Sequence, residues 1–263
     1  MLIHVVADYG AGDLAFAEVA QAVVRHLPNA TVVPTPVGPF DTVGAGFCVA
    51  QLALSDGPSD RIVFHNVAPR ADDSDPRAAN EGERLVAGRA PTGALIVGPN
   101  AGWCFSFVRD EVDELREVEV PAAGSQFRSR DIFPEAIARL AFDERPPLGD
   151  VIGTDAVPDP PGRVVLYVDG YGNVKTGWGE APVESGSRVE VEIDGATAGA
   201  VVSDGTFEVP DGELSFAPGS AGWPLRAGGE LRFYELLLRG GSAAERLGHP
   251  APGTPVEVST SGS

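Results

Sequence analysis

A proline cluster, Pro158-Asp159-Pro160-Pro161-Gly162, separates two parts of the chain that differ in hydrophobic pattern. Proline fixes its own φ angle and has no backbone N–H to donate, so this segment can continue neither a helix nor a central strand. We therefore expect a linker at 158–162, one domain over residues 1–157 and a second over residues 163–263. A chain of 263 residues is long enough for both domains to have a hydrophobic core.

The part before the proline cluster alternates short apolar runs with longer segments of helical spacing. Strand-like runs stand at 2–7, 30–34, 61–67 and 93–97, and helical apolar spacing at 14–27 and 42–54. Strands that alternate with helices predict an α/β domain with a mostly parallel sheet. The segment 68–88 is rich in Asp, Arg and Ala, and we expect it to form a surface loop.

The part after the proline cluster consists of short alternating runs separated by Gly and Pro turns. These runs stand at 163–168, 187–193, 199–202, 230–234 and 255–258. The pattern predicts a smaller, all-β, barrel-like domain. A short helix is expected within 236–247, and Ser259–Ser263 is expected to be a frayed tail.

Composition excludes several classes of partner. The net charge of −19 argues against binding to nucleic acid or to an anionic membrane. No apolar run reaches the roughly 18 residues that span a bilayer, and the first residues resemble a strand and not an export signal, so we expect a cytoplasmic protein. Cys48 and Cys104 belong to no metal-binding pattern, so we expect buried free thiols and neither a metal nor a cofactor.

Three residues near the ends of predicted elements are candidates for ligand binding. Asp8 follows the first strand, where α/β sheets bind ligands; its carboxylate could accept hydrogen bonds from both hydroxyls of a ribose, or cap a helix. Phe40 lies before the second helix, where it could fill the core or exclude water from a reaction. Asn66 ends the third strand, beside His65. Of the arginines that follow it, Arg70 or Arg77 is the candidate for the same site.

A second candidate group is Phe127-Arg128-Ser129-Arg130-Asp131. The Ser129 hydroxyl and the guanidinium of Arg128 could hold a small anion through several N–H and O–H donors. An arginine has too high a pKa to accept a proton at neutral pH, so Arg128 cannot act as a general base. Arg130 and Asp131 have the alternative interpretation of a structural ion pair at a helix start.

Two segments of the second part complete the set of candidates. Asp169-Gly170-Tyr171-Gly172-Asn173 has the composition of a tight turn, and it could also present Asp169 and Asn173 to a ligand. The stretch from Phe233 to Gly248 holds an apolar run followed by Gly240-Gly241-Ser242.

In this order along the chain, the segments resemble motifs of the S-adenosylmethionine hydroxide adenosyltransferases, a family with fluorinating and chlorinating relatives. Asp8-Tyr9-Gly10 is similar to the family's Asp-Phe-Gly or Asp-Leu-Gly turn, and Asp169–Asn173 to its Asp-x-Phe-Gly-Asn motif. Residues 127–131 resemble Phe-His-Gly-Arg-Asp of the hydroxide-using members and Phe-Tyr-Ser-Arg-Asp of the fluorinating ones. Gly98-Pro99-Asn100-Ala101-Gly102 is similar to the family's Gly-Pro-Asp-Asn-Gly turn. The segment that starts at Phe233 is similar to a family segment near the end of the chain.

The resemblance implies an enzyme that cleaves S-adenosylmethionine at the ribose 5′ carbon, with water as nucleophile, to give adenosine and L-methionine. It implies catalytic roles for Arg128, Ser129, Asn66 and Arg70. It also implies a substrate-binding set: Asp8 on the ribose, Phe40 as an aromatic wall, Asp169 on the methionine amino group, Asn173 with Asp8 on the nucleoside, and Phe233 and Gly241 at the adenine. Phe127 belongs to the same substrate-binding set. The family's homotrimers, with sites at subunit interfaces, imply the same assembly here.

The chain departs from the family at three places. Asn66 stands where the hydroxide-using members have aspartate, and Arg128 where they have histidine. Glu230 and Leu231 occupy the region where relatives bind the methionine carboxylate through a serine. These departures leave three alternatives open: a halogenating enzyme, an enzyme with a different adenosyl or nucleoside substrate, and a binding protein without catalytic activity.

Overall fold

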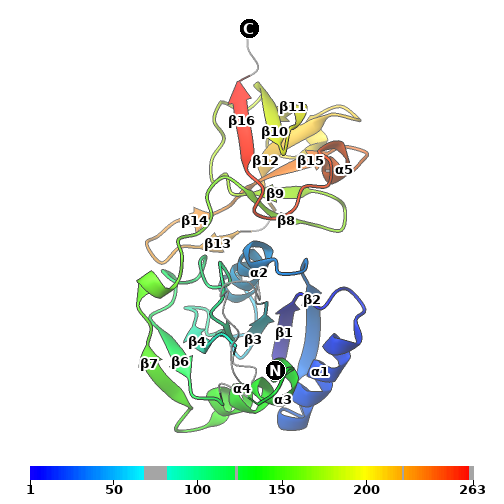
Figure 1. Cartoon of the computed structure of the whole chain (residues 1–263). Helices are drawn as coiled ribbons and strands as arrows, with labels where there is room; N and C mark the ends of the chain where they lie inside the picture. The colour runs from blue at the N-terminus through cyan, green and yellow to red at the C-terminus, as the bar shows by residue number, and fades with distance from the viewer. Residues whose placement is uncertain (68–81, 122–123, 221, 261–263) are drawn as a thin grey trace. The chain divides into compact units, whose positions relative to one another are not determined.

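The computed structural model describes residues 1–67, 82–121, 124–220 and 222–260. The chain divides into two compact units, Met1–Pro160 and Pro161–Ser263, which are described separately (Figure 1). Arg70 and Arg77, with most of the expected surface loop, lie outside the described residues. No helix in the described part of the chain has both the length and the apolar character needed to cross a membrane.

The first unit is built on a seven-stranded sheet of order β2-β1-β3-β5-β4-β6-β7. Its strands are β1 Leu2–Ala7, β2 Thr31–Pro36, β3 Ile62–Asn66, β4 Leu85–Arg89, β5 Leu95–Pro99, β6 Leu115–Val118 and β7 Leu148–Val151. Its helices are α1 Leu14–His26, α2 Thr42–Leu54, α3 Arg128–Asp131 and α4 Phe133–Phe142, with a 3-10 turn η2 at Thr154–Ala156. In this sheet, β2, β1, β3 and β5 run parallel to one another, whereas the pairs β5–β4, β4–β6 and β6–β7 are antiparallel.

The predicted mostly parallel sheet, and with it the predicted fold class, is wrong. The sheet of the first unit is mixed, and most strand pairings of the chain's described part are antiparallel. The last part of the expected loop is β4, which reverses directly into β5 through residues 90–94. A connection this short permits only antiparallel pairing, because a parallel pair needs a crossover of a dozen or more residues.

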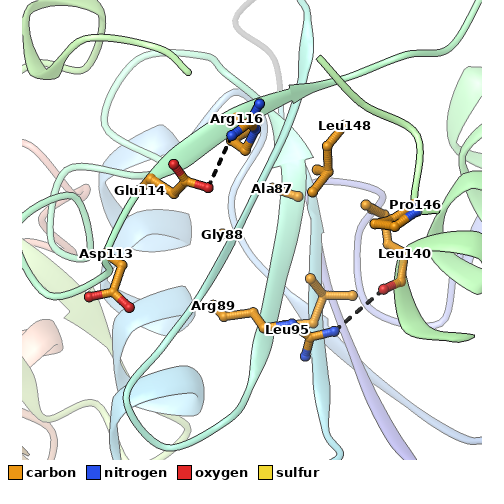
Figure 2. Close-up of a pocket in the computed structure, with 10 residues that line it drawn as sticks. All are labelled: Ala87, Gly88, Arg89, Leu95, Asp113, Glu114, Arg116, Leu140, Pro146 and Leu148. Carbon is orange, nitrogen blue, oxygen red and sulfur yellow. Dashed lines mark hydrogen bonds and ion pairs between the residues drawn. The ribbon is translucent and has the colours of Figure 1, made fainter. Parts of the chain in front are cut away.

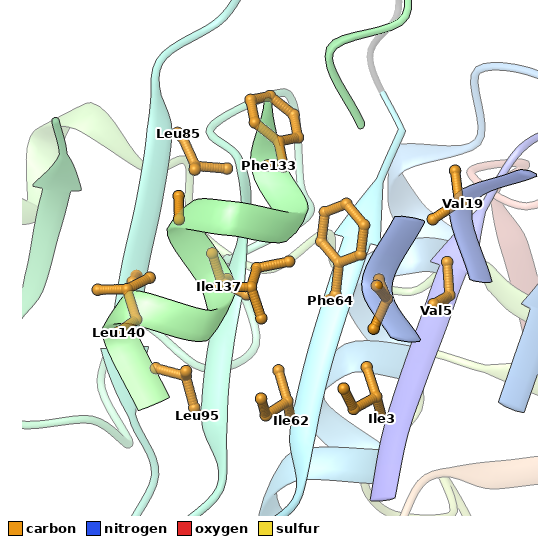
Figure 3. Close-up of a cluster of buried hydrophobic side chains, with 14 of the residues drawn as sticks. Ile3, Val5, Val19, Ile62, Phe64, Leu85, Leu95, Phe133, Ile137 and Leu140 are labelled. Atoms are coloured by element: carbon orange, nitrogen blue, oxygen red, sulfur yellow. The ribbon is translucent and has the colours of Figure 1, made fainter. Parts of the chain in front are cut away.

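Apolar residues on alternate positions of the central strands form the core of the first unit. Figure 3 shows Phe133, Ile137 and Leu140 of α4 lying over β3 and its neighbours. Helices α1 and α4 pack on this face of the sheet. Helix α2 packs against β1, β3 and β5 outside this cluster, and nearly all its residues are buried, as expected for a helix that is apolar all round.

Arg61 fixes the end of α2. Its guanidinium is buried and donates to the carbonyl oxygens of Leu52, Ala53 and Ser55 at 2.8, 2.8 and 2.5 Å, and to that of Pro58 at 2.8 Å. The last carbonyl groups of a helix have no partner within the helix, so a cation there both pairs them and opposes the helix dipole. This anchor joins α2 to the start of β3.

The second unit contains a seven-stranded sheet of order β16-β10-β11-β12-β15-β9-β8. The strands are β8 Val165–Val168, β9 Val174–Thr176, β10 Arg188–Ile193, β11 Ala196–Val202, β12 Leu214–Pro218, β15 Tyr234–Leu238 and β16 Val256–Thr260. A backbone bridge between Val164 and Pro255 joins the two outer strands where they begin. A hairpin of β13 Trp223–Pro224 and β14 Glu230–Leu231, the 3-10 turn η3 at Thr206–Glu208 and helix α5 at Ala243–Arg246 complete the unit.

The structure tests two local predictions for this unit. The short helix expected within 236–247 is confirmed as α5, and the residues before it form the strand β15 between β12 and β9. The frayed tail expected from Ser259 is wrong for Ser259 and Thr260, which belong to β16 and pair with β10. The error concerns residues whose placement depends on neighbours distant in sequence.

Candidate functional site

The order of the parallel strands defines a switch point beside β1. The chain passes from β1 through α1 to β2 on one side, and then returns through α2 to β3 on the other side of β1. Ligands of open α/β sheets bind outside the carboxyl ends of strands at such a reversal. Asp8 and Tyr9 follow β1 directly, and Asn66 ends β3 opposite Ala7. The sheet therefore brings Asp8, Tyr9 and Asn66 to one edge.

Asp8 holds the loop that carries Phe40. Its Oδ2 accepts the backbone N–H of Phe40 at 3.0 Å, and Phe40 has a φ of 59°. A non-glycine residue in this left-handed region is strained, and such strain is found mainly where the surroundings impose it. The phenyl ring of Phe40 is 50% exposed, so it does not fill the core. An exposed aromatic ring thus stands beside the Asp8 carboxylate.

Tyr9 connects three segments that are far apart in sequence. Its hydroxyl lies 2.6 Å from the Ser129 Oγ, and the Asn66 side chain lies close enough to influence its pKa. Its ring packs edge-on against Phe16 and Phe127, with centroids 5.1 and 5.9 Å away. Burial raises the pKa of Tyr9 well above its usual value, so the phenol keeps its proton and can donate a hydrogen bond to the Ser129 Oγ or accept one from it. The structure thus brings together Asp8, Phe40, Asn66, Phe127 and Ser129.

Asp41 places a second carboxylate near Asp8. It caps α2, accepting the Gly44 N–H at 2.7 Å. Burial raises the pKa of Asp41 to about 6, and the nearby charge of Asp8 acts in the same direction. Neither Asp41 nor Tyr9 was predicted from the sequence to belong to the site. An aspartate before a helical pattern was the available signal for Asp41, and there was none for Tyr9.

Arg128 is held by a backbone carbonyl and an aromatic ring, and Arg130 by an ion pair. The Arg128 Nη1 donates to the Glu83 carbonyl oxygen at 2.9 Å, and its guanidinium lies over the Phe133 ring, 4.9 Å from the centroid. Arg130 forms the expected ion pair with Asp131, with Nε 2.7 Å from Oδ1. Its hydrogen bond, together with one from Ser125, lowers the pKa of Asp131 to about 2. The structural interpretation of the Arg130–Asp131 pair is confirmed.

The candidates of the second unit lie at one turn, between β8 and β9. The Asp169 Oδ1 accepts the backbone N–H groups of Tyr171 and Asn173 at 2.9 and 3.0 Å, and Oδ2 accepts the Asn173 side-chain amide at 2.9 Å. A Cβ on Gly172 would lie 2.0 Å from the Ser242 Oγ, so only glycine permits this approach. Asp169, Asn173 and the segment beside Gly241 are therefore brought together, and the Tyr171 ring is 84% exposed.

The remaining residues of the second unit lie elsewhere. Phe233 packs against Trp223 in the unit's hairpin region, with ring centroids 5.8 Å apart, and Glu230 pairs with Arg232 at 3.0 Å. Within the ranges that the structure describes, no three His, Cys, Asp or Glu side chains are grouped so as to hold a metal ion. The thiols of Cys48 and Cys104 are both buried.

Comparison with known proteins adds information on the fold. No protein-family model matches the chain, and no curated protein matches it. An uncharacterized conserved protein from Thermotoga maritima is similar in structure with a TM-score of 0.75 and 22% identity, over 97% of this chain and 99% of that one. A conserved hypothetical protein from Thermus thermophilus gives a TM-score of 0.68 and 27% identity, over 97% and 98%. The two-unit fold therefore occurs in at least two further proteins, whose descriptions name no activity.

Proposed function

We propose that the chain binds an adenosyl group at the carboxyl ends of β1 and β3 and cleaves S-adenosylmethionine to adenosine and L-methionine, with water as the nucleophile. One observation carries the proposal: Asp8 stands at the switch point with Oδ2 engaged by Phe40, and no partner of Oδ1 occurs among the described residues. A carboxylate in this position can accept the hydroxyl groups of a ribose. The motifs quoted above supply the identity of the substrate.

The proposed reaction is a substitution at the 5′ carbon. The water oxygen bonds to that carbon, the carbon–sulfur bond breaks with its electron pair passing to sulfur, and the water proton is lost to solvent. Because the sulfonium is already a good leaving group, catalysis requires mainly a nucleophile that is aligned and partly stripped of water. The proposed roles are water exclusion for Phe40 and Phe127, and nucleophile positioning for Ser129, Asn66, Arg128 and Arg70.

A specific observation favours a second candidate, a protein that binds the adenosyl compound without turning it over. The partly buried group of Tyr9, Ser129 and Asn66 is electrically neutral, and Tyr9 retains its proton. None of these groups, nor the cation of Arg128, accepts a proton readily from water at neutral pH. Turnover and binding must therefore be measured separately.

Incubation with S-adenosylmethionine, followed by chromatography, tests the activity. We expect adenosine and methionine in equal amounts from the wild type, and kcat/KM about 100-fold lower for Asp8→Ala, because a hydrogen bond to a charged group contributes roughly 1.5–3 kcal/mol. Asp13→Asn is the matched control: it removes one negative charge but keeps the cap of α1, where Asp13 accepts the Ala15 N–H at 2.7 Å. It should retain full activity.

The other products decide between the alternatives. Formation of halogenated adenosine in the presence of chloride or fluoride would show that the chain is a halogenating enzyme and would contradict the proposed hydroxide reaction. Binding without any product would establish the second candidate. Equal loss of activity in Asp8→Ala and Asp13→Asn would contradict the role of Asp8.

We also propose a cytoplasmic homotrimer with its ligand sites at subunit interfaces. The motif resemblance alone supports this assembly. Sedimentation equilibrium should give a mass three times that of the 27.3 kDa chain. A monomer at micromolar concentration would exclude it.

A further inference from the structure

A pocket lies in the first unit, at the opposite end of the strands from Asp8. Leu95, which lines it, is the first residue of β5 and pairs with Ile62, the first residue of β3. The candidate site lies instead beyond Asn66, the last residue of β3. The pocket has a volume of about 250 Å³ and is bounded by β4, β5, the end of α4 and the segment that leads into β7 (Figure 2). It is thus a separate feature of the fold.

The pocket has an apolar wall and charged groups of both signs around it. The wall is made of aliphatic side chains from four segments: Ala87, Leu95, Leu140, Pro146 and Leu148. Figure 2 shows the side chain of Arg89 extending along one edge of this group toward Leu140. Asp113, Glu114 and Arg116 also line the pocket, and Glu114 pairs with Arg116 at 3.2 Å.

Arg89 differs from Arg116 in its partners. Its Nη2 donates to the Leu140 carbonyl oxygen at 3.4 Å and its Nη1 to that of Gly93 at 3.5 Å, both long contacts. Throughout the described ranges, no carboxylate lies within ion-pair distance of Arg89. The chain has 38 acidic and 19 basic residues, so a carboxylate partner is available in excess and is still absent at this position. The guanidinium therefore retains donors for an external anion.

The size of the pocket limits the ligand. An apolar cavity of roughly 150 Å³ accommodates benzene, and pockets for larger organic ligands measure about 300–1,000 Å³. A volume of about 250 Å³ therefore suits one ring with a short polar extension. Arginine pairs with carboxylates through two parallel hydrogen bonds, which gives it an advantage for this anion.

We infer that this pocket binds a small aromatic carboxylic acid, with the ring against Leu95, Leu140 and Leu148 and the carboxylate on Arg89. The inference does not depend on the proposed function, because the two sites share no residue. Adenosine should therefore not compete with the acid.

Phenylacetate is the probe, and phenylacetamide is its uncharged analogue of the same shape. Titration of methyl-labelled protein, followed by NMR, should give saturable shifts of the leucine methyl groups that line the pocket. Phenylacetate should bind at least tenfold more tightly than the amide, since the amide loses the charged contact. Absence of saturable shifts at phenylacetate concentrations up to about 20 mM would overturn the inference, and so would equal affinities for phenylacetate and phenylacetamide.

Variants locate the binding. Arg89→Gln should weaken phenylacetate binding about tenfold and leave the weak binding of the amide unchanged. Arg84→Gln is the matched control next to the same strand, since Arg84 pairs with Glu117 and does not line the pocket. Leu148→Glu places a negative charge at a partly exposed position of the wall and should abolish binding of the acid without disturbing the fold. Unchanged affinity in both Arg89→Gln and Leu148→Glu would show that phenylacetate binds elsewhere.

Discussion

The Lys175→Met variant is expected to lose about 3–5 kcal/mol of unfolding free energy, because it leaves a buried carboxylate without its cation. Lys175 is the only lysine of the chain. It lies on β9 directly opposite Glu235 on β15, and the two side chains form an ion pair with 13% and 6% exposure. Gly219 lies against the carboxylate, where a Cβ would be 2.4 Å from Oε1, so no side chain there can compensate.

The double variant Lys175→Met/Glu235→Met tests the cause. Replacing both partners by apolar groups of similar length should restore most of the stability, because no buried charge remains. Arg188→Met is the control: it breaks an exposed ion pair with Glu213 in the same unit and should cost less than about 1 kcal/mol. Urea unfolding followed by fluorescence of Trp178 and Trp223, both buried in the second unit, measures all three. A double variant as unstable as Lys175→Met would contradict the argument.

The His65→Leu variant is expected to resist acid better than the wild type. His65 has no exposed surface, and within the described part of the chain neither of its ring nitrogens has a hydrogen-bond partner. Its ring packs against Phe105, with centroids 4.8 Å apart, and directly over Gly98, where a Cβ would be 2.3 Å from Nε2. Burial in these apolar surroundings lowers the pKa of His65 from 6.5 to about 3.

The direction of the pH effect follows from which state binds the proton. Between pH 6.5 and about 3 the unfolded chain protonates this histidine and the folded chain does not, so unfolding free energy falls as the pH falls. At about 1.4 kcal/mol per pKa unit, the full window corresponds to roughly 5 kcal/mol, and acidification from pH 7 to 4.5 to about 3 kcal/mol. The raised pKa of Asp41 acts in the opposite direction between 3.8 and about 6, because the folded state then binds the proton more strongly.

The difference between His65→Leu and the wild type removes the contribution of Asp41. Unfolding free energies at pH 7 and pH 4.5 should show the variant gaining about 3 kcal/mol on the wild type over this interval. Phe64→Leu, a buried substitution on the same strand that cannot titrate, should lower stability equally at both pH values. Parallel pH profiles of the wild type and His65→Leu would show that His65 is not buried in its neutral form.

The hydrophobic pattern of the sequence predicted those helices and strands whose burial is determined by residues close to one another in the chain. The helical spacing of 14–27 and 42–54 gave α1 and α2 nearly to the residue, and the first and third strand-like runs became β1 and β3. The pattern did not predict β4, because the acidic and arginine-rich residues before it resemble a loop, and its partners β5 and β6 lie on both sides of it. The direction of a strand depends on such partners, which explains the error in fold class.

The sequence likewise predicted only part of the candidate site. Asp8 and Asn66 follow strand-like runs, so their position at the edge of a sheet could be anticipated. The bond between Tyr9 and Ser129 could not, since 120 residues separate the two and only the packing of α3 on α1 brings them together. The guanidinium of Arg128 seemed free to hold an anion, but the structure adds its contacts with the Glu83 carbonyl and the Phe133 ring.

Isothermal titration calorimetry with adenosine tests the central claim, that Asp8 binds a ribose beside β1 and β3. Wild type and Asp13→Asn should bind adenosine with equal affinity. Asp8→Asn keeps an oxygen for the Phe40 N–H but loses an acceptor and the charge, so it should bind at least tenfold more weakly. No heat from the wild type, or an unchanged dissociation constant in Asp8→Asn, would contradict the claim.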